Sequence, residues 1–128
     1  MTIDAALSQL LIGSPAFAAV GDRVYPKKLP EGPVYPAIVF HRISTVREHS
    51  HDGSSSLAGV RFQFDIYART YVAARDAADG LRSVLDGFRG VVAGVDINGA
   101  FNEDEDDGYD DDIQVYWFRQ DYRILHNE

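Results

Sequence analysis

The sequence predicts an α+β fold: a small antiparallel sheet of two β-hairpins that are joined by a crossover helix, with helices packed on one face of the sheet. Residues 60–69 alternate between apolar and polar side chains, which is the period of a strand with one buried face. The apolar set is Val60, Phe62, Phe64, Ile66 and Ala68, and the polar set is Arg61, Gln63, Asp65, Tyr67 and Arg69. Residues 71–88 then carry apolar side chains at helical spacing, so we predict a helix directly after this strand.

Helix caps, prolines and alternation define the other predicted elements. Thr2 is a good N-cap residue in front of a periodic apolar stretch, which predicts a first helix over residues 3–12. Pro30, Pro33 and Pro36 predict an extended loop, because proline fixes φ and lacks an N–H. The remaining predictions are a helical turn over residues 14–19, a short strand at 24–25, and strands over 37–47, 58–69, 91–101 and 113–125. Gly94 allows a bulge or bend at 92–94 within the strand over 91–101.

Length and composition limit the classes of protein that the chain can belong to. We predict a single domain over residues 1–128. The absence of cysteine excludes disulfides, thiolate metal sites and a cysteine nucleophile. The N-terminus has no basic, apolar leader, and no apolar run is long enough for a membrane span, so neither secretion nor a membrane partner is expected.

The formal net charge of -8 comes from one segment. Eight of the twenty acidic residues fall in ten positions, which we interpret as a solvated hairpin loop after the strand at 91–101. They are Glu103, Asp104, Glu105, Asp106, Asp107, Asp110, Asp111 and Asp112. The rest of the chain is neutral and has no basic stripe, so specific binding to nucleic acid is not expected.

Two groups of residues have a composition that suits a metal, but neither predicts a site. If Gly108 is placed at the sixth position of an EF-hand loop, Gln114 occupies the position where the bidentate Glu is required, so only weak binding of Mg²⁺ or Ca²⁺ remains open. His49, His51 and Asp52 carry ligand types for zinc, yet a polar turn at Asp52 explains them more simply.

No pattern in the chain predicts covalent catalysis. The three serines at 54–56 lack the glycine pattern of a nucleophile elbow, and the scattered glycines form no phosphate loop. We therefore predict no catalytic residues and no cofactor, and we interpret the polar strand face as a surface that contacts partners.

Several segments, taken in order, resemble the tail-completion or tail-terminator proteins of long-tailed phages and gene transfer agents. The resemblance extends from Leu7 to about Ile124 and depends on the order of the segments, since no single motif is diagnostic. The segments are the N-terminal helix, Val24–Pro26 with the proline-rich loop, Pro36–Val39, Arg42–Ser44, Glu48–Gly53, Val60–Arg69 and Ala77–Gly90.

The resemblance implies a structural role. Members of the family form a small antiparallel sheet packed against helices and assemble as a hexameric ring. The ring caps the head-proximal end of the tail tube, ends tube polymerisation and joins the tail to the head connector, without catalysis. The implied locations are the host bacterial cytoplasm during assembly and then the virion tail at the head–tail interface.

We expect the contacts of such a ring in two regions. The loop with Glu48, His49 and Asp52, together with the polar face formed by Arg61, Gln63, Asp65, Tyr67 and Arg69, is predicted to touch neighbouring copies or the tube. The acidic segment is predicted to lie near the channel, where DNA passes without specific binding, or against a basic patch on the connector.

Other functions stay open at this point. The chain could instead be a connector stopper or a tail-tube subunit, because small α+β virion proteins of these kinds share its simple organisation. From another class, a small metal-dependent enzyme or ligand-binding domain would use His41, His49, His51 and Asp52.

Overall fold

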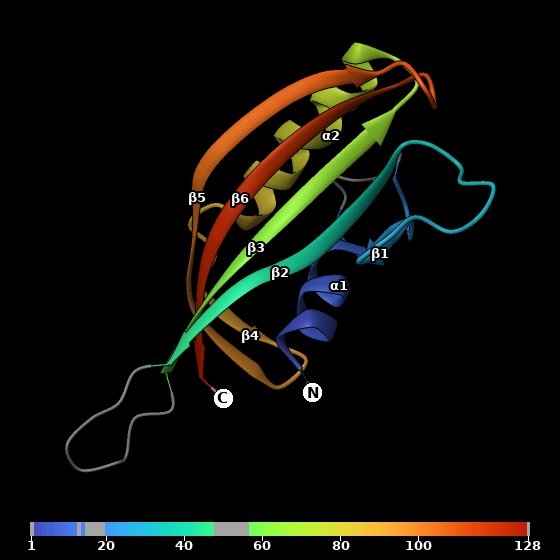
Figure 1. Ribbon diagram of the computed structural model, residues 1–128. Helices are drawn as coiled ribbons and strands as arrows, with labels where there is room; N and C mark the ends of the chain where they lie inside the picture. Colours follow the sequence, from blue (N-terminus) through green and yellow to red (C-terminus); the bar gives the residue numbers. More distant parts are fainter. Residues whose placement is uncertain (1, 13, 15–19, 48–56, 128) are drawn as a thin grey trace, which may run out of the picture.

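One curled sheet of six strands forms a half-barrel around the core (Figure 1). The computed structural model describes residues 2–12, 14, 20–47 and 57–127. The strand order across the sheet is β1-β2-β3-β6-β5-β4. The elements are α1 (Ile3–Ile12), β1 (Val24–Pro26), β2 (Ala37–Arg47), β3 (Leu57–Ala68), α2 (Tyr71–Leu85), β4 (Gly90–Val92), β5 (Val95–Asp110) and β6 (Val115–Asn127).

The sheet is mixed, because β1 lies parallel to β2 while every other neighbouring pair is antiparallel. The long strands β2, β3, β6 and β5 form its centre. The edge strands β1 and β4 are short and cover only part of their neighbours. β1 pairs with Ile38 to Phe40, and β4 pairs with Val95 to Ile97.

The alternation predicted for β3 is confirmed. Its inward side chains are buried, and they join one apolar cluster with residues of both helices and the other strands. Phe64 stacks on Phe40 of β2 at 5.7 Å between ring centroids and meets Tyr122 of β6 edge-on at 5.5 Å. These aromatic contacts hold the three central strands together from the inside.

Both helices begin where the sequence predicts. Thr2 caps α1 by accepting the Ala5 N–H at 3.3 Å, and Thr70 caps α2 by accepting the Ala73 N–H at 3.1 Å. α2 ends at Leu85, three residues earlier than predicted. Gly87, at φ +80°, follows in the left-handed conformation that glycine favours, and its N–H donates to the Ala100 carbonyl at 2.7 Å.

The predicted fold class is wrong. Instead of two small hairpins with helices packed on one face, the chain forms a single curled mixed sheet with two helices. α2 lies against β3, β5 and β6, whereas α1 contacts β1 and β4, the two edges of the sheet. The curl brings both edges to the same helix, and simple alternation along a strand carries no information on this curvature.

The acidic loop was also predicted in the wrong conformation. Most of the acidic run belongs to β5, which pairs with β6 up to Asp110 and Val115, so only Asp111 and Asp112 lie in the turn. The predicted strand over 91–101 is in fact split by a tight turn at Ala93 and Gly94, whose φ angles of 51° and 81° are typical of a two-residue hairpin turn. In the described part of the chain, neither helix has the length and hydropathy of a membrane span.

Candidate partner interface on the outer sheet face

The outer, solvent-facing side of the sheet presents polar and aromatic residues in cross-strand rows. Strand pairing brings residues of β3, β6 and β5 side by side, since residues at matching positions share a face. From one end to the other the rows are Tyr67–Trp117–Gly108, Asp65–Arg119–Asp106, Gln63–Asp121–Asp104 and Arg61–Arg123–Phe101. We call these residues the outer face.

An ion pair crosses the middle of the outer face. Asp65 of β3 is 7% exposed, and its Oδ1 accepts a hydrogen bond from Arg119 Nε of β6 at 2.9 Å. The hydrogen bond to Asp65 raises the pKa of the Arg119 guanidinium, so the arginine keeps its positive charge. The Asp65 carboxylate is therefore already bonded within the chain, although the sequence marked it as a partner contact.

The aromatic row lies beside this pair. The Arg119 guanidinium carbon lies 5.1 Å from the centroid of the Trp117 ring, as in a cation–π contact. The Trp117 ring also lies across Gly108, where a Cβ atom would be 2.5 Å from the indole Cζ2. A side chain at position 108 would therefore displace the tryptophan. Burial, followed by the charge of Asp65, raises the pKa of Tyr67, so its hydroxyl stays neutral and can donate a hydrogen bond.

Arg69, the last of the predicted contact residues on this segment, lies just past the end of β3. Its guanidinium carbon is 4.9 Å from the centroid of the Tyr35 ring. This contact links the end of β3 to the proline-rich loop before β2. Arg69 is thus near the aromatic row but not part of the outer face.

Carboxylates face each other on the β5 side of the outer face. Asp104 and Asp121 are directly paired across β5 and β6, and Asp121 Oδ1 is buried without a hydrogen-bond partner among the described residues. They line a hollow of about 290 Å³ together with Gln63, Asp106 and Arg119. Asp121 Oδ2 is 3.3 Å from Arg61, which partly balances this charge. No group of three or more His, Asp or Glu in the described part of the chain is placed to hold a metal ion.

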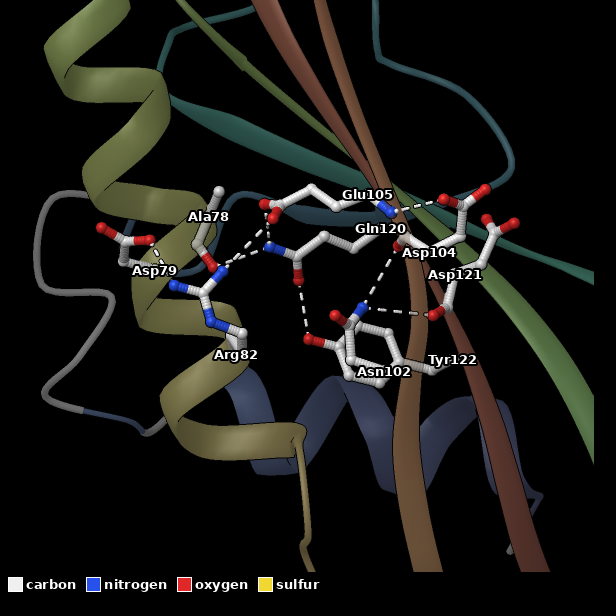
Figure 2. Close-up of polar contacts among 9 residues, drawn as sticks. All are labelled: Ala78, Asp79, Arg82, Asn102, Asp104, Glu105, Gln120, Asp121 and Tyr122. Atoms are coloured by element: carbon white, nitrogen blue, oxygen red, sulfur yellow. Dashed lines mark hydrogen bonds and ion pairs between the residues drawn. The ribbon is translucent and has the colours of Figure 1, made fainter.

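On the inner side, a polar network fastens α2 to the sheet (Figure 2). Gln120 is fully buried, and its Nε2 donates to the Ala78 carbonyl of α2 at 3.0 Å and to Glu105 Oε1 at 2.9 Å. The Tyr122 hydroxyl donates to Gln120 Oε1 at 2.6 Å. Arg82 of α2 reaches Glu105 Oε2 at 3.4 Å. One acid of the run, Glu105, therefore has a structural position rather than a place in a solvated loop.

The histidines are separated in the described structure. His41 of β2 lies opposite Gln63 of β3, whereas His126 is buried near the end of β6. His49, His51 and Asp52, like the predicted contact Glu48, lie outside the described residues. The described residues therefore give no geometric support for the metal-dependent alternative.

Four of the predicted contact residues lie beside residues of β6 that were not selected from the sequence. Arg61, Gln63, Asp65 and Tyr67 share the outer face as predicted from their alternation. Their β6 neighbours Trp117, Arg119, Asp121 and Arg123 were missed as a group. The signal was present, since the same alternation places Trp117 opposite to its neighbours Tyr116 and Phe118.

Comparison with known proteins identifies the family. A sequence profile of the family described as "Tail completion protein gp17" matches residues 5–127. The chain belongs to this family. It is therefore a structural protein of the phage-type virion tail, with a role in tail assembly and contacts to other tail or head proteins.

A solved structure shows that the fold occurs in a virion. A chain of the structure titled "Virion of native gene transfer agent (GTA) particle" superimposes with a TM-score of 0.74 at 18% sequence identity. The alignment covers 98% of this chain and 95% of that chain. At this identity the likeness concerns the fold. Among curated proteins, none matches this sequence.

Proposed function

We propose that the chain is the tail terminator of its particle. In this role it assembles as a hexameric ring, caps the head-proximal end of the tail tube, ends tube polymerisation and joins the tail to the head connector. The observation that carries the proposal is the match to the tail completion family over residues 5–127, which leaves almost no part of the described fold unaccounted for. The role is non-enzymatic.

The outer face supplies a contact surface of the kind that such a ring needs. Tyr67 and Trp117 offer amphipathic area at one end of the face, and Arg61 and Arg123 offer charge at the other. Tyrosine, tryptophan and arginine are the residue types enriched at the centres of protein interfaces. Because Asp65 and Arg119 satisfy each other, a partner is expected to engage the aromatic row rather than the buried carboxylate.

The acidic residues of β5 and the following turn have a second role in this proposal. Most of them are exposed, among them Asp104, Asp106, Asp107 and Asp111. If they face the channel, like charge keeps DNA from adhering as it passes, and if they face the connector they attract a basic patch. Replacing Asp104 and Asp106 by asparagine distinguishes these two placements. Slower DNA exit would indicate that the acidic residues face the channel, and loss of head attachment would indicate that they face the connector.

Deletion of the gene in the source genome tests the proposal. We expect filled heads without tails, or tails of uncontrolled length, in electron micrographs of the induced lysate. A tube subunit would instead be recognised by the loss of all tubes, and a connector stopper by heads that lose their DNA while tails keep normal length. Particles with normal joined tails would refute the proposed function.

A further inference from the structure

The sheet has two margins that differ in chemistry, one formed by β1 and β2 and the other by β5. β2 is paired on both sides only up to Phe40, and among the described residues His41 to Val46 lie beside β3 alone in the sheet. Most side chains in this stretch are exposed, including the apolar Ile43 and Val46. An exposed strand margin with apolar side chains is a surface that proteins normally cover or protect.

The opposite margin is protected by its own side chains. On β5 the Glu105 N–H donates to Asp104 Oδ1 at 2.9 Å, and the Asp107 N–H donates to Asp106 Oδ1 at 2.9 Å. These donors are not available for a further strand unless the carboxylates move. A neighbour at this margin is therefore expected to bind through side chains rather than by extending the backbone ladder.

The charges of the two margins are opposite. Residues 20–47, which contain β1 and β2, carry five Lys or Arg and two acids, whereas residues 86–114, which contain β4 and β5, carry ten acids and one Arg. Lys27 and Lys28 are exposed on the first side, and Asp107 and Asp111 are exposed on the second. Arg42 is exposed on the first side as well, but it pairs with Asp4 of α1 at 3.3 Å. Apolar area is matched too, since Tyr109 and Ile113 are exposed near the acidic side as Ile43 and Val46 are on the basic side.

We infer that the basic margin of β1 and β2 docks the acidic margin of β5 from a second copy of the chain. Because the two margins are different surfaces of the same molecule, the contact is head-to-tail, and repetition of such a contact closes a ring when the rotation permits. The inference rests on the proposed ring and names the surfaces that build it. Contacts of exposed opposite charges are screened by salt, so the ring is expected to weaken as ionic strength rises.

Two charge-reversed variants test the contact by complementation. One carries Lys27→Glu and Lys28→Glu, and the other carries Asp107→Lys and Asp111→Lys. In each variant alone, the substituted side chains carry the same sign of charge as the residues proposed to face them, so we expect loss of the ring by native mass spectrometry and loss of joined particles in a deletion strain. When both variants are expressed together, each offers the margin that the other needs, and alternating copies are expected to restore the ring and the joined particles.

Matched controls and separate outcomes keep the test decisive. Arg75→Glu and Asp76→Lys change exposed charges that belong to α2 and not to β1, β2 or β5, and are expected to assemble as wild type. Circular dichroism melts confirm that each variant is folded. Normal rings from either reversed variant alone, or folded variants that fail to complement when mixed, would overturn the contact. Joined particles in the deletion strain without any copy of the protein would refute the proposed function itself, which is a different result.

Discussion

Arg119 Nε of β6 lies 2.9 Å from Asp65 Oδ1 of β3, across the centre of the outer face. The two partners differ in environment, because the Asp65 side chain is 10% exposed and the Arg119 side chain is 45% exposed. The carboxylate is the buried member of the pair. The more exposed guanidinium also lies near the Trp117 ring. The pair therefore fixes β3 against β6 at the place where a partner is proposed to bind.

Removal of Arg119 is expected to destabilise the fold because it leaves a buried carboxylate without its donor. For Arg119→Ala we expect a loss of about 1–2 kcal/mol in the free energy of unfolding, at the low end for such pairs since the arginine is partly solvated. Urea unfolding measures it. Arg123→Ala is the matched control, because its nitrogen lies 3.8 Å from Glu103 in an exposed setting, and a change within about 0.5 kcal/mol is expected. Equal effects of the two substitutions would contradict this assignment.

Substitution of Gln120 should lower the free energy of unfolding more than removal of an exposed ion pair does. Gln120→Leu removes the amide that serves the Ala78 carbonyl, Glu105 and the Tyr122 hydroxyl, and we expect a loss of about 2–4 kcal/mol. Hydrogen exchange of the α2 amides provides a second measurement, since α2 is fastened to β6 through this residue. Unchanged stability together with unchanged α2 protection would show that the network is not structural.

Stability is expected to fall at alkaline pH through Tyr122. Burial raises the pKa of its hydroxyl above the ordinary value of about 10. The folded state thus holds the proton more tightly than the unfolded state, so the contribution is complete below pH about 10 and is lost as pH rises beyond it. Tyr122→Phe should show a shallower fall in unfolding free energy above pH 10 than wild type, besides the loss of one hydrogen bond at neutral pH. Parallel pH profiles would contradict this role for Tyr122.

Tyr67 and Arg69 are expected to matter for assembly more than for folding. Replacing both by alanine should impair ring formation or tail joining, because it removes exposed parts of the aromatic row and its flank, while thermal unfolding stays within a few degrees of wild type. Joined particles counted in electron micrographs give the readout. Arg75→Ala with Ser83→Ala, both exposed on α2, is the control pair. Normal joining by the Tyr67/Arg69 variant would remove these residues from the interface.

The sequence predicted elements well where a period or a cap was present. The bounds of α1, the start of α2 and the inward set of β3 were correct, because caps and alternation are local signals. β6 was also found, from Tyr122 and its alternating neighbours. These segments supply most of the core.

The failures have a common physical cause, which is that pairing overrides local preference. Aspartate and glutamate are poor strand formers, so Glu103 to Asp110 read as a loop, yet pairing with β6 and the bonds of Glu105 to Gln120 and Arg82 keep this segment extended. Gly94 indicated a bulge or bend within the predicted strand, but alanine at position 93 gave no indication of a left-handed hairpin turn. The curl of the sheet, and hence the rows of the outer face, depends on contacts between distant strands such as β3 and β6.

The most direct test of the tail-terminator assignment is complementation in vitro. Purified wild-type protein is added to a lysate of the deletion strain that contains separate heads and tails, and joined particles are counted by electron microscopy. We expect joined particles to rise with added protein, and the Tyr67→Ala/Arg69→Ala variant to restore fewer of them. Heads and tails that stay separate with folded wild-type protein, or that join without it, would contradict the assignment.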